Sequence, residues 1–225
     1  MWLWPRYWLR RILFATPLRR LVFPRYQYAY APRQLAILLD LVDEARAQTG
    51  DLAEIGCFVG ATTIFLNRHL QAVHDQRRYF AVDTFNGFTR ADVAIEEQQR
   101  GKAIQAVERD CLFAMNSKPW FDYTMSLNGI SDVTSIAGDI ATVSLANHSK
   151  RLCFALIDVD LYVPTCAALA QVWPLLAPGG IIVIDDCAAN HVFDGSRAAW
   201  LEFINKHGVS EVLLADKLAV IRKPL

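Results

Sequence analysis

The chain lacks an excess of charge of either sign. Its 225 residues include 23 basic and 23 acidic side chains, so the formal net charge is zero. A protein that binds nucleic acid through its phosphates usually carries a basic surface. The composition therefore argues against a nucleic-acid partner. The hydrophobic fraction of 53% indicates that a large core can form.

Cysteine motifs are also missing. The five cysteines are dispersed, and none forms a CxxC pair or a Cys/His group at zinc-ligand spacing. An odd, dispersed set of thiols is typical of a reduced protein, so we expect a cytoplasmic location.

Long apolar runs are absent near the start of the chain. The longest uncharged run there extends from Ile12 to Leu18 and contains Pro17. A membrane-spanning helix needs about 20 apolar residues. Arginines return at Arg19 and Arg20, which argues against a signal peptide.

Residues 1–32 instead combine tryptophan, tyrosine and arginine, with six arginines in residues 1–25. Two interpretations stay open. The segment packs over the core or against a second subunit of a homodimer, or it makes peripheral contact with a membrane through its Trp and Arg side chains. Residues 33–48 have the spacing of an amphipathic helix. We therefore expect an extension and helix over 1–49 and a catalytic domain over 50–225.

From residue 51 onward, strand and helix signals alternate. Strands are expected at 51–56, 78–85, 132–138, 152–160 and 181–187, helices at 61–73, 164–180 and 197–208, and a closing hairpin at 211–216 and 218–223. Continuous apolar strands that alternate with helices indicate a parallel sheet covered on both faces. The predicted fold is α/β and Rossmann-like, a doubly wound, mostly parallel seven-stranded sheet with an antiparallel C-terminal hairpin strand. Residues 89–130 exceed a usual connection and are a candidate lid, with Trp120, Phe121 and Tyr123 as candidate lining.

The first two strands end in features that suit a nucleotide. EIGCFVG supplies Glu54, Gly56 and Gly60 before a helix begins, and the second strand ends at Asp83. Glycines allow a backbone to approach a ligand closely, and a carboxylate after the second strand can accept hydrogen bonds from a ribose diol. Taken alone, the pattern is equally typical of a glycine turn beside a surface aspartate.

Two later strands end in acids. Asp158 and Asp160 follow one strand, and Asp185 and Asp186 follow the next. If the strands are neighbours, these carboxylates converge, and their mutual repulsion requires protons or a cation. Oxygen ligands suit Mg²⁺, Mn²⁺ or Ca²⁺. The alternative is that the acids cap the helices that follow.

The ordered motifs EIGCFVG, VDTFNGF, IAGD, LIDVDLYVPT, PGGIIVIDDC and GSRAAWLEF resemble the macrocin O-methyltransferase (TylF-like) family over residues 50–225. The resemblance implies S-adenosylmethionine as methyl donor and magnesium held by strand-end aspartates. It places Glu54, Gly56 and Gly60 at the donor, Asp83 at its ribose and Asp139 near its adenine. It also implies that Asp158, Asp185 and Asp186 are metal ligands and that Asp160 is the general base.

The expected activity is therefore metal-assisted transfer of a methyl group to a sugar or phenolic hydroxyl of a small molecule or glycan. Tyr162 and His191 are close in sequence to the acids and are candidate acceptor contacts. Two alternatives remain. One is a nicotinamide-dependent Rossmann oxidoreductase, although GxGxxG is missing. The other is a catalytically inactive, membrane-associated binding protein on the same fold.

Overall fold

The computed structural model describes residues 3–17, 28–102, 116–189 and 194–225. In these ranges the α-helices are α1 (Leu3–Phe14), α3 (Pro32–Ala45), α4 (Ala61–Ala72), α5 (Arg90–Gln98), α7 (Lys118–Leu127), α8 (Tyr162–Leu175) and α9 (Gly195–His207). The strands are β1 (Asp51–Ile55), β2 (Tyr79–Asp83), β3 (Val133–Ala137), β4 (Leu152–Ile157), β5 (Leu176–Ile184), β6 (Leu213–Leu214) and β7 (Leu218–Arg222).

The seven strands form one sheet in the order β3-β2-β1-β4-β5-β7-β6. Strands β1 to β5 pair in parallel, and β7 pairs antiparallel with both β5 and β6. The predicted doubly wound sheet with an antiparallel C-terminal strand is confirmed. The strand order reverses between β1 and β4, and a doubly wound sheet binds its ligands beyond the carboxyl ends of the strands at such a point.

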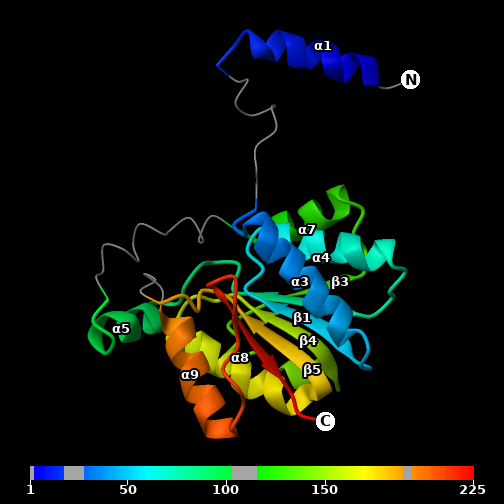
Figure 1. The fold of residues 1–225 in the computed structure, drawn as a ribbon. Coiled ribbons are helices and arrows are strands. Elements are labelled where there is room, and N and C mark those ends of the chain that lie inside the picture. The colour runs from blue at the N-terminus through cyan, green and yellow to red at the C-terminus, as the bar shows by residue number, and fades with distance from the viewer. Residues whose placement is uncertain (1–2, 18–27, 103–115, 190–193) are drawn as a thin grey trace.

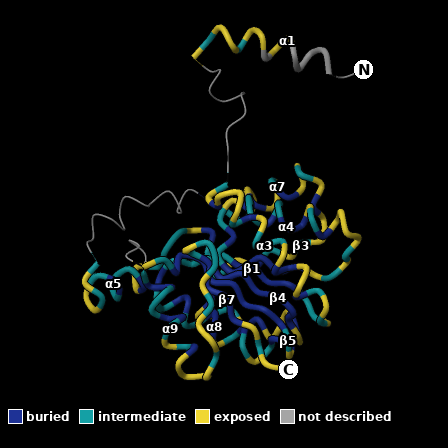
Figure 2. The backbone as a smooth tube through the Cα atoms, viewed as in Figure 1, coloured by how far each residue is buried: buried dark blue, intermediate teal, exposed yellow. Residues whose placement is uncertain are grey.

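Helices cover both faces of the sheet (Figure 1). One face packs against α3 and α4, where apolar side chains such as Leu38 and Leu66 meet Phe154 of β4. The other face packs against α8 and α9, where Val172 and Trp200 meet the sheet. Strand β4 is buried at every residue, and β1 at all but its first (Figure 2), which is why their sequences are nearly continuous apolar runs.

Local sequence signals explain where several helices begin. Helix α3 has Pro32 in its first turn, and the side chain of Gln34 accepts a hydrogen bond from the Ala31 amide at 2.8 Å. The hydroxyls of Thr89 and Ser117 accept from backbone amides in the first turns of α5 and α7. Such caps satisfy amide donors that the helix itself leaves unpaired.

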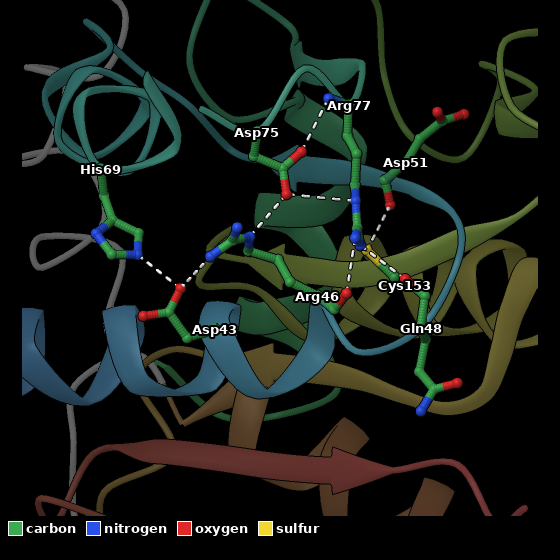
Figure 3. Close-up of polar contacts among 8 residues, drawn as sticks. All are labelled: Asp43, Arg46, Gln48, Asp51, His69, Asp75, Arg77 and Cys153. Carbon is green, nitrogen blue, oxygen red and sulfur yellow. Dashed lines mark hydrogen bonds and ion pairs between the residues drawn. The ribbon is translucent and has the colours of Figure 1, made fainter. Parts of the chain in front are cut away.

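A charge network fixes the end of α3 at the amino-terminal edge of the sheet (Figure 3). Arg46 contacts Asp43 at 2.7 Å and Asp75 at 2.7 Å. Arg77, which comes just before β2, donates to the carbonyl oxygens of Gln48 at 2.7 Å and Arg46 at 2.6 Å. These contacts join the segments that enter β1 and β2. They leave the opposite, carboxyl edge of the sheet free for a ligand.

One predicted boundary is wrong. The helix expected over 164–180 ends at Leu175, and residues 176–180 belong to β5. Pro174 lies in the last turn of α8, and Gly179 donates to the carbonyl oxygen of Lys223, which follows β7. The Pro-Gly-Gly run is therefore part of an irregular strand start rather than a helix stop.

The segment 89–130 is helical at α5 and α7, and residues 103–115 lie outside the described ranges. Phe121 is buried against the sheet, while Trp120 and Tyr123 are exposed on α7. Among the residues that the structure describes, every helix is too short or too polar to cross a bilayer.

Candidate functional site

A single cleft of about 310 Å³ lies beyond the carboxyl ends of β1, β2, β4 and β5. Its lining includes all of the residues expected at a donor site except Gly60, together with the four strand-end aspartates. The lining includes Tyr30, Glu54, Gly56, Asp83, Asp139, Asp158, Asp160, Asp185, Asp186 and Lys217. Two groups that are separated in the sequence therefore share one cavity.

The glycine loop between β1 and α4 forms one wall. Gly56 has a φ of 89°, and a Cβ atom there would collide with the carbonyl oxygen of Asp158. Gly60 adopts φ 86° before α4, and a Cβ there would collide with the side chain of Met125. Only glycine fits either position, so the loop can approach both the neighbouring strand end and a ligand.

Asp83 lies at the end of β2 and anchors this loop. Its carboxylate accepts from the Phe58 amide at 2.8 Å and from the Phe85 amide at 2.7 Å. Each carboxylate oxygen has a further lone pair, so Asp83 can still accept hydrogen bonds from ribose hydroxyls. Asp139 follows β3 and accepts from the Ala141 amide at 2.8 Å. Both residues line the cleft, on the side away from the acidic strand ends of β4 and β5.

Glu54 is almost fully buried at 1% exposure, although one side of it reaches the cleft. Its Oε2 atom accepts from the Thr63 hydroxyl at 2.6 Å and from the Tyr79 hydroxyl at 2.8 Å. Burial raises the pKa of Glu54 to about 7, against the lowering effect of these two hydrogen bonds. The carboxyl therefore keeps its proton at pH values where an ordinary glutamate has lost it.

The four aspartates come together because β4 and β5 are neighbours, with Ile157 paired to Ile184. Carboxylate oxygens of Asp158, Asp160 and Asp186 all lie within 4.8 Å of one another. Asp160 and Asp186 also have positive φ values of 62° and 55°, which are strained for residues with a side chain. The geometry thus brings Asp160 into the group of converging oxygens.

Asp185, which the family resemblance placed among the metal ligands, has one carboxylate oxygen in an ion pair with a lysine. Its Oδ2 atom lies 2.9 Å from the Nζ atom of Lys217, which is also 3.1 Å from Asp186 Oδ1. Its Oδ1 atom is buried and has no hydrogen-bond partner in the described part of the chain. On the other side of the cluster, the Tyr30 hydroxyl donates to Asp158 Oδ2 at 2.9 Å.

The electrostatics of the cluster show that it holds too much negative charge. Burial, followed by repulsion from Asp185, raises the pKa of Asp158 well above its usual value. Burial and the neighbouring Asp186 do the same to the pKa of Asp160. Burial lowers the pKa of Lys217, but the carboxylates of Asp185 and Asp186 outweigh it and leave that pKa raised. One lysine cannot neutralise four carboxylates, so the site favours protons or a further cation.

Sequence reasoning missed Tyr30 and Lys217. Tyr30 stands in an aromatic-rich stretch, and Lys217 stands in a turn between two strands, where a lysine is usually solvated. Neither residue carried a signal of its contacts with the aspartates. Tyr162 instead donates to Glu202 at 2.6 Å and is not part of the cleft lining, while His191 lies outside the described residues.

Comparisons with known proteins identify the family of this chain. The family profile described as Macrocin-O-methyltransferase (TylF) matches residues 24–223. A tetracenomycin-C 4'-O-methyltransferase of Streptomyces olivaceus, whose named substrate carries a dimethoxyrhamnosyl group, is 28% identical over 72% of this chain. Mycinamicin III 3''-O-methyltransferase of Micromonospora griseorubida is 28% identical over 76% of this chain. The matched regions span 60% and 67% of the lengths of these two relatives.

Solved structures show the same fold. The O-methyltransferase NovP superposes with a TM-score of 0.73 at 20% identity, covering 86% of this chain and 80% of NovP. The calicheamicin methyltransferase CalS11 gives a TM-score of 0.70 at 21% identity, covering 95% of this chain and 89% of CalS11. The family match spans most of the sequence and contains every expected site residue. This chain belongs to the macrocin O-methyltransferase (TylF) family.

Proposed function

We propose that this protein transfers the methyl group of S-adenosylmethionine to a hydroxyl group on the sugar of a small-molecule glycoside, with a divalent cation bound beside the acceptor. The observation that carries the proposal is the shared cleft. It joins a glycine loop and Asp83 at one side to four crowded carboxylates at the other. Family membership supports methyl transfer, and the sugar acceptor follows the named substrates of the relatives.

The residues at β1 and β2 fit the donor. The backbone at Gly56 carries no side chain and can approach a ligand closely, and the amino end of α4 follows the loop directly. Asp83 lines the cleft and its carboxylate can accept further hydrogen bonds from two ribose hydroxyls; in this proposal Asp139, on the same side of the cleft, contacts the adenine. Glu54, beneath the loop, is the acid that faces the methionine end of the donor in this proposal.

The residues at β4 and β5 fit a hard divalent cation. We assign Asp158, Asp185 and Asp186 as ligands and Asp160 as the base. The buried and unpaired Oδ1 atom of Asp185 supports its assignment, because a buried charged oxygen without a partner is costly. The convergence of Asp160 with Asp158 and Asp186 supports a base within reach of a hydroxyl held at the same site. Magnesium is the expected ion because all of these ligands are oxygen atoms.

When bound, the donor supplies a methyl group activated by the positive charge on sulfur, and the cation lowers the pKa of a coordinated hydroxyl. The chain itself contributes position and proton transfer. The glycine loop and Asp83 hold the donor in a fixed orientation. Asp160, whose pKa is raised by burial and by Asp186, accepts the proton of the acceptor hydroxyl. The Tyr30 hydroxyl fixes the orientation of the Asp158 carboxylate.

The test is a transfer assay with methyl-labelled S-adenosylmethionine and two acceptor panels, one of glycosides with free sugar hydroxyls and one of simple phenols. We expect labelled product from the glycosides, and loss of label transfer on adding EDTA. The variant D160N should lose at least 100-fold in turnover, the usual contribution of a general base, with unchanged affinity for S-adenosylhomocysteine. The matched control D132N changes an exposed acid just before β3 and should behave like the parent.

The nicotinamide alternative makes the opposite prediction. Calorimetry would show tighter binding of NAD than of S-adenosylhomocysteine. In the label-transfer assay, D160N would not differ from the parent. An inactive binding protein would bind the donor and yet transfer no label to any acceptor with the cation present. Either result would contradict the proposed function.

A further inference from the structure

The helix α1 is chemically unlike the rest of the chain. Residues 1–39 contain seven arginines, no lysine and no acidic residue. Because the whole chain is balanced at 23 basic and 23 acidic side chains, residues 40–225 carry seven more acids than bases. The family match begins at residue 24, after α1 has ended at Phe14. Helix α1 and its arginines therefore lie outside the part that matches the family.

Four large apolar side chains of α1 are exposed. Trp8 is 55%, Ile12 62% and Phe14 57% exposed, and Leu9 is 56% exposed. Trp8 and Ile12 are one helical turn apart, so they lie on the same face. The guanidinium of Arg11 lies 5.6 Å from the centre of the Trp8 ring, in a cation–π contact. Large apolar groups left in water this way are unfavourable unless another surface covers them.

We propose that α1 is a peripheral docking helix for an anionic lipid surface. Tryptophan is favoured at the boundary between headgroups and acyl chains, and arginine pairs with lipid phosphates. At 12 residues the helix is about 18 Å long, so it suits a position in the plane of the interface rather than across it. The absence of any acid before Asp40 removes the repulsion that such a surface would otherwise meet.

Area, rather than charge, decides between a lipid surface and the other candidate occupant, a second copy of this chain. The excess acids of residues 40–225 offer charge to α1 as well. However, a stable protein interface buries about 1,200–2,000 Å² in total, which is a large area for a 12-residue helix with four exposed apolar side chains. A helix that lies in the lipid interface buries only one apolar face, about 5–10 Å deep, and the exposed apolar side chains of α1 provide such a face.

Docking would also limit the distance between the cleft and the bilayer. Tyr30 lines the cleft and is separated from Phe14 by 16 positions in the sequence. A fully extended chain of that length spans at most about 55 Å. The cleft would therefore remain within that distance of the bilayer while the protein is docked. This inference is independent of the methyl-transfer proposal, because the experiment below measures lipid binding alone.

The experiment is co-sedimentation of the full chain with vesicles of phosphatidylcholine alone and of phosphatidylcholine with 30% phosphatidylglycerol. We expect binding to the anionic vesicles in 50 mM salt and release in 300 mM salt, because screening weakens the attraction to the surface. R10Q/R11Q should bind roughly 25-fold more weakly, at about fivefold per arginine. W8A/I12A should lose at least about tenfold, since two large side chains no longer leave water.

The matched control is W120A/Y123A, which removes two exposed aromatic side chains from α7 instead. It should bind vesicles like the parent, which would show that α1 and not general surface aromaticity drives binding. Equal binding of the parent and both α1 variants would overturn the proposal. So would absence of vesicle binding together with a dimer, seen by analytical ultracentrifugation, that W8A/I12A dissociates, because the occupant would then be a second copy.

Discussion

Replacing Glu54 with glutamine isolates one buried charge of the site. The carboxyl is buried, and burial raises its pKa from 4.5 to about 7. A raised pKa means that the folded state holds the proton more tightly than the unfolded chain. Folding stability is therefore lost as the pH rises from about 4.5 to about 7. At 1.36 kcal/mol per pH unit, the loss amounts to about 3 kcal/mol.

Glutamine keeps the shape of the side chain but cannot ionise. Its amide oxygen can accept the same two hydrogen bonds that Thr63 and Tyr79 donate to Oε2. The assay is urea unfolding of parent and E54Q at half-unit steps from pH 4.5 to 8 without metal. The strand-end aspartates titrate in both proteins, so their contribution cancels in the difference.

We expect the stability of E54Q relative to the parent to rise by about 3 kcal/mol across this range and then to level off above pH 7. Parallel stability curves at every pH would refute the reasoning, because Glu54 would then have the same pKa in the folded and unfolded states. A difference that stays flat up to pH 7 and rises only between pH 7 and 8 would show that another group is responsible.

Three further predictions follow from the same contacts. D83N should weaken binding of S-adenosylhomocysteine by roughly 1.5–3 kcal/mol in calorimetry, because charged hydrogen-bond acceptors are lost, and equal affinity would remove Asp83 from the donor site. K217M should tighten Mn²⁺ binding about tenfold, because the variant removes the ammonium group that competes with the cation for Asp185 and Asp186. Weaker binding in K217M would show instead that the lysine supports the cation. D75N should lower stability at pH 7, and the difference from the parent should shrink as the pH falls below 3.8, because burial, which raises the pKa of Asp75, is outweighed by the hydrogen bonds and charges of Arg46 and Arg77 together. A difference that stays constant as the pH is lowered would argue against that lowered pKa.

The sheet could be predicted from the sequence because its strands are buried on both faces and are therefore continuous apolar runs. The same reasoning placed the acids at neighbouring strand ends, which the pairing of β4 with β5 confirms. The start of β5 was missed because Leu176 and Ala177 continue the helical pattern of α8. Apolar spacing alone does not distinguish a helix end from an irregular strand start.

The partners of the acidic cluster could not be predicted for a different reason. Tyr30 and Lys217 reach the aspartates from segments 128 positions before Asp158 and 32 positions after Asp185. Their contacts depend on how α3 and the final hairpin pack on the sheet, and a sequence pattern carries no information on such long-range side-chain contacts. The division of roles among the four aspartates likewise depends on side-chain directions rather than on strand order.

The binding of Mn²⁺ to the full chain, followed by electron paramagnetic resonance in the presence of S-adenosylhomocysteine, tests the central claim most directly. The account predicts one bound Mn²⁺ per chain in the parent and in D160N, and none in D158N or D185N that retain the parent's circular dichroism spectrum. Retention of the ion in D185N with its loss in D160N would make Asp160 the ligand in place of Asp185. Absence of bound Mn²⁺ in the parent, or equal binding in D158N, would contradict the cation site altogether.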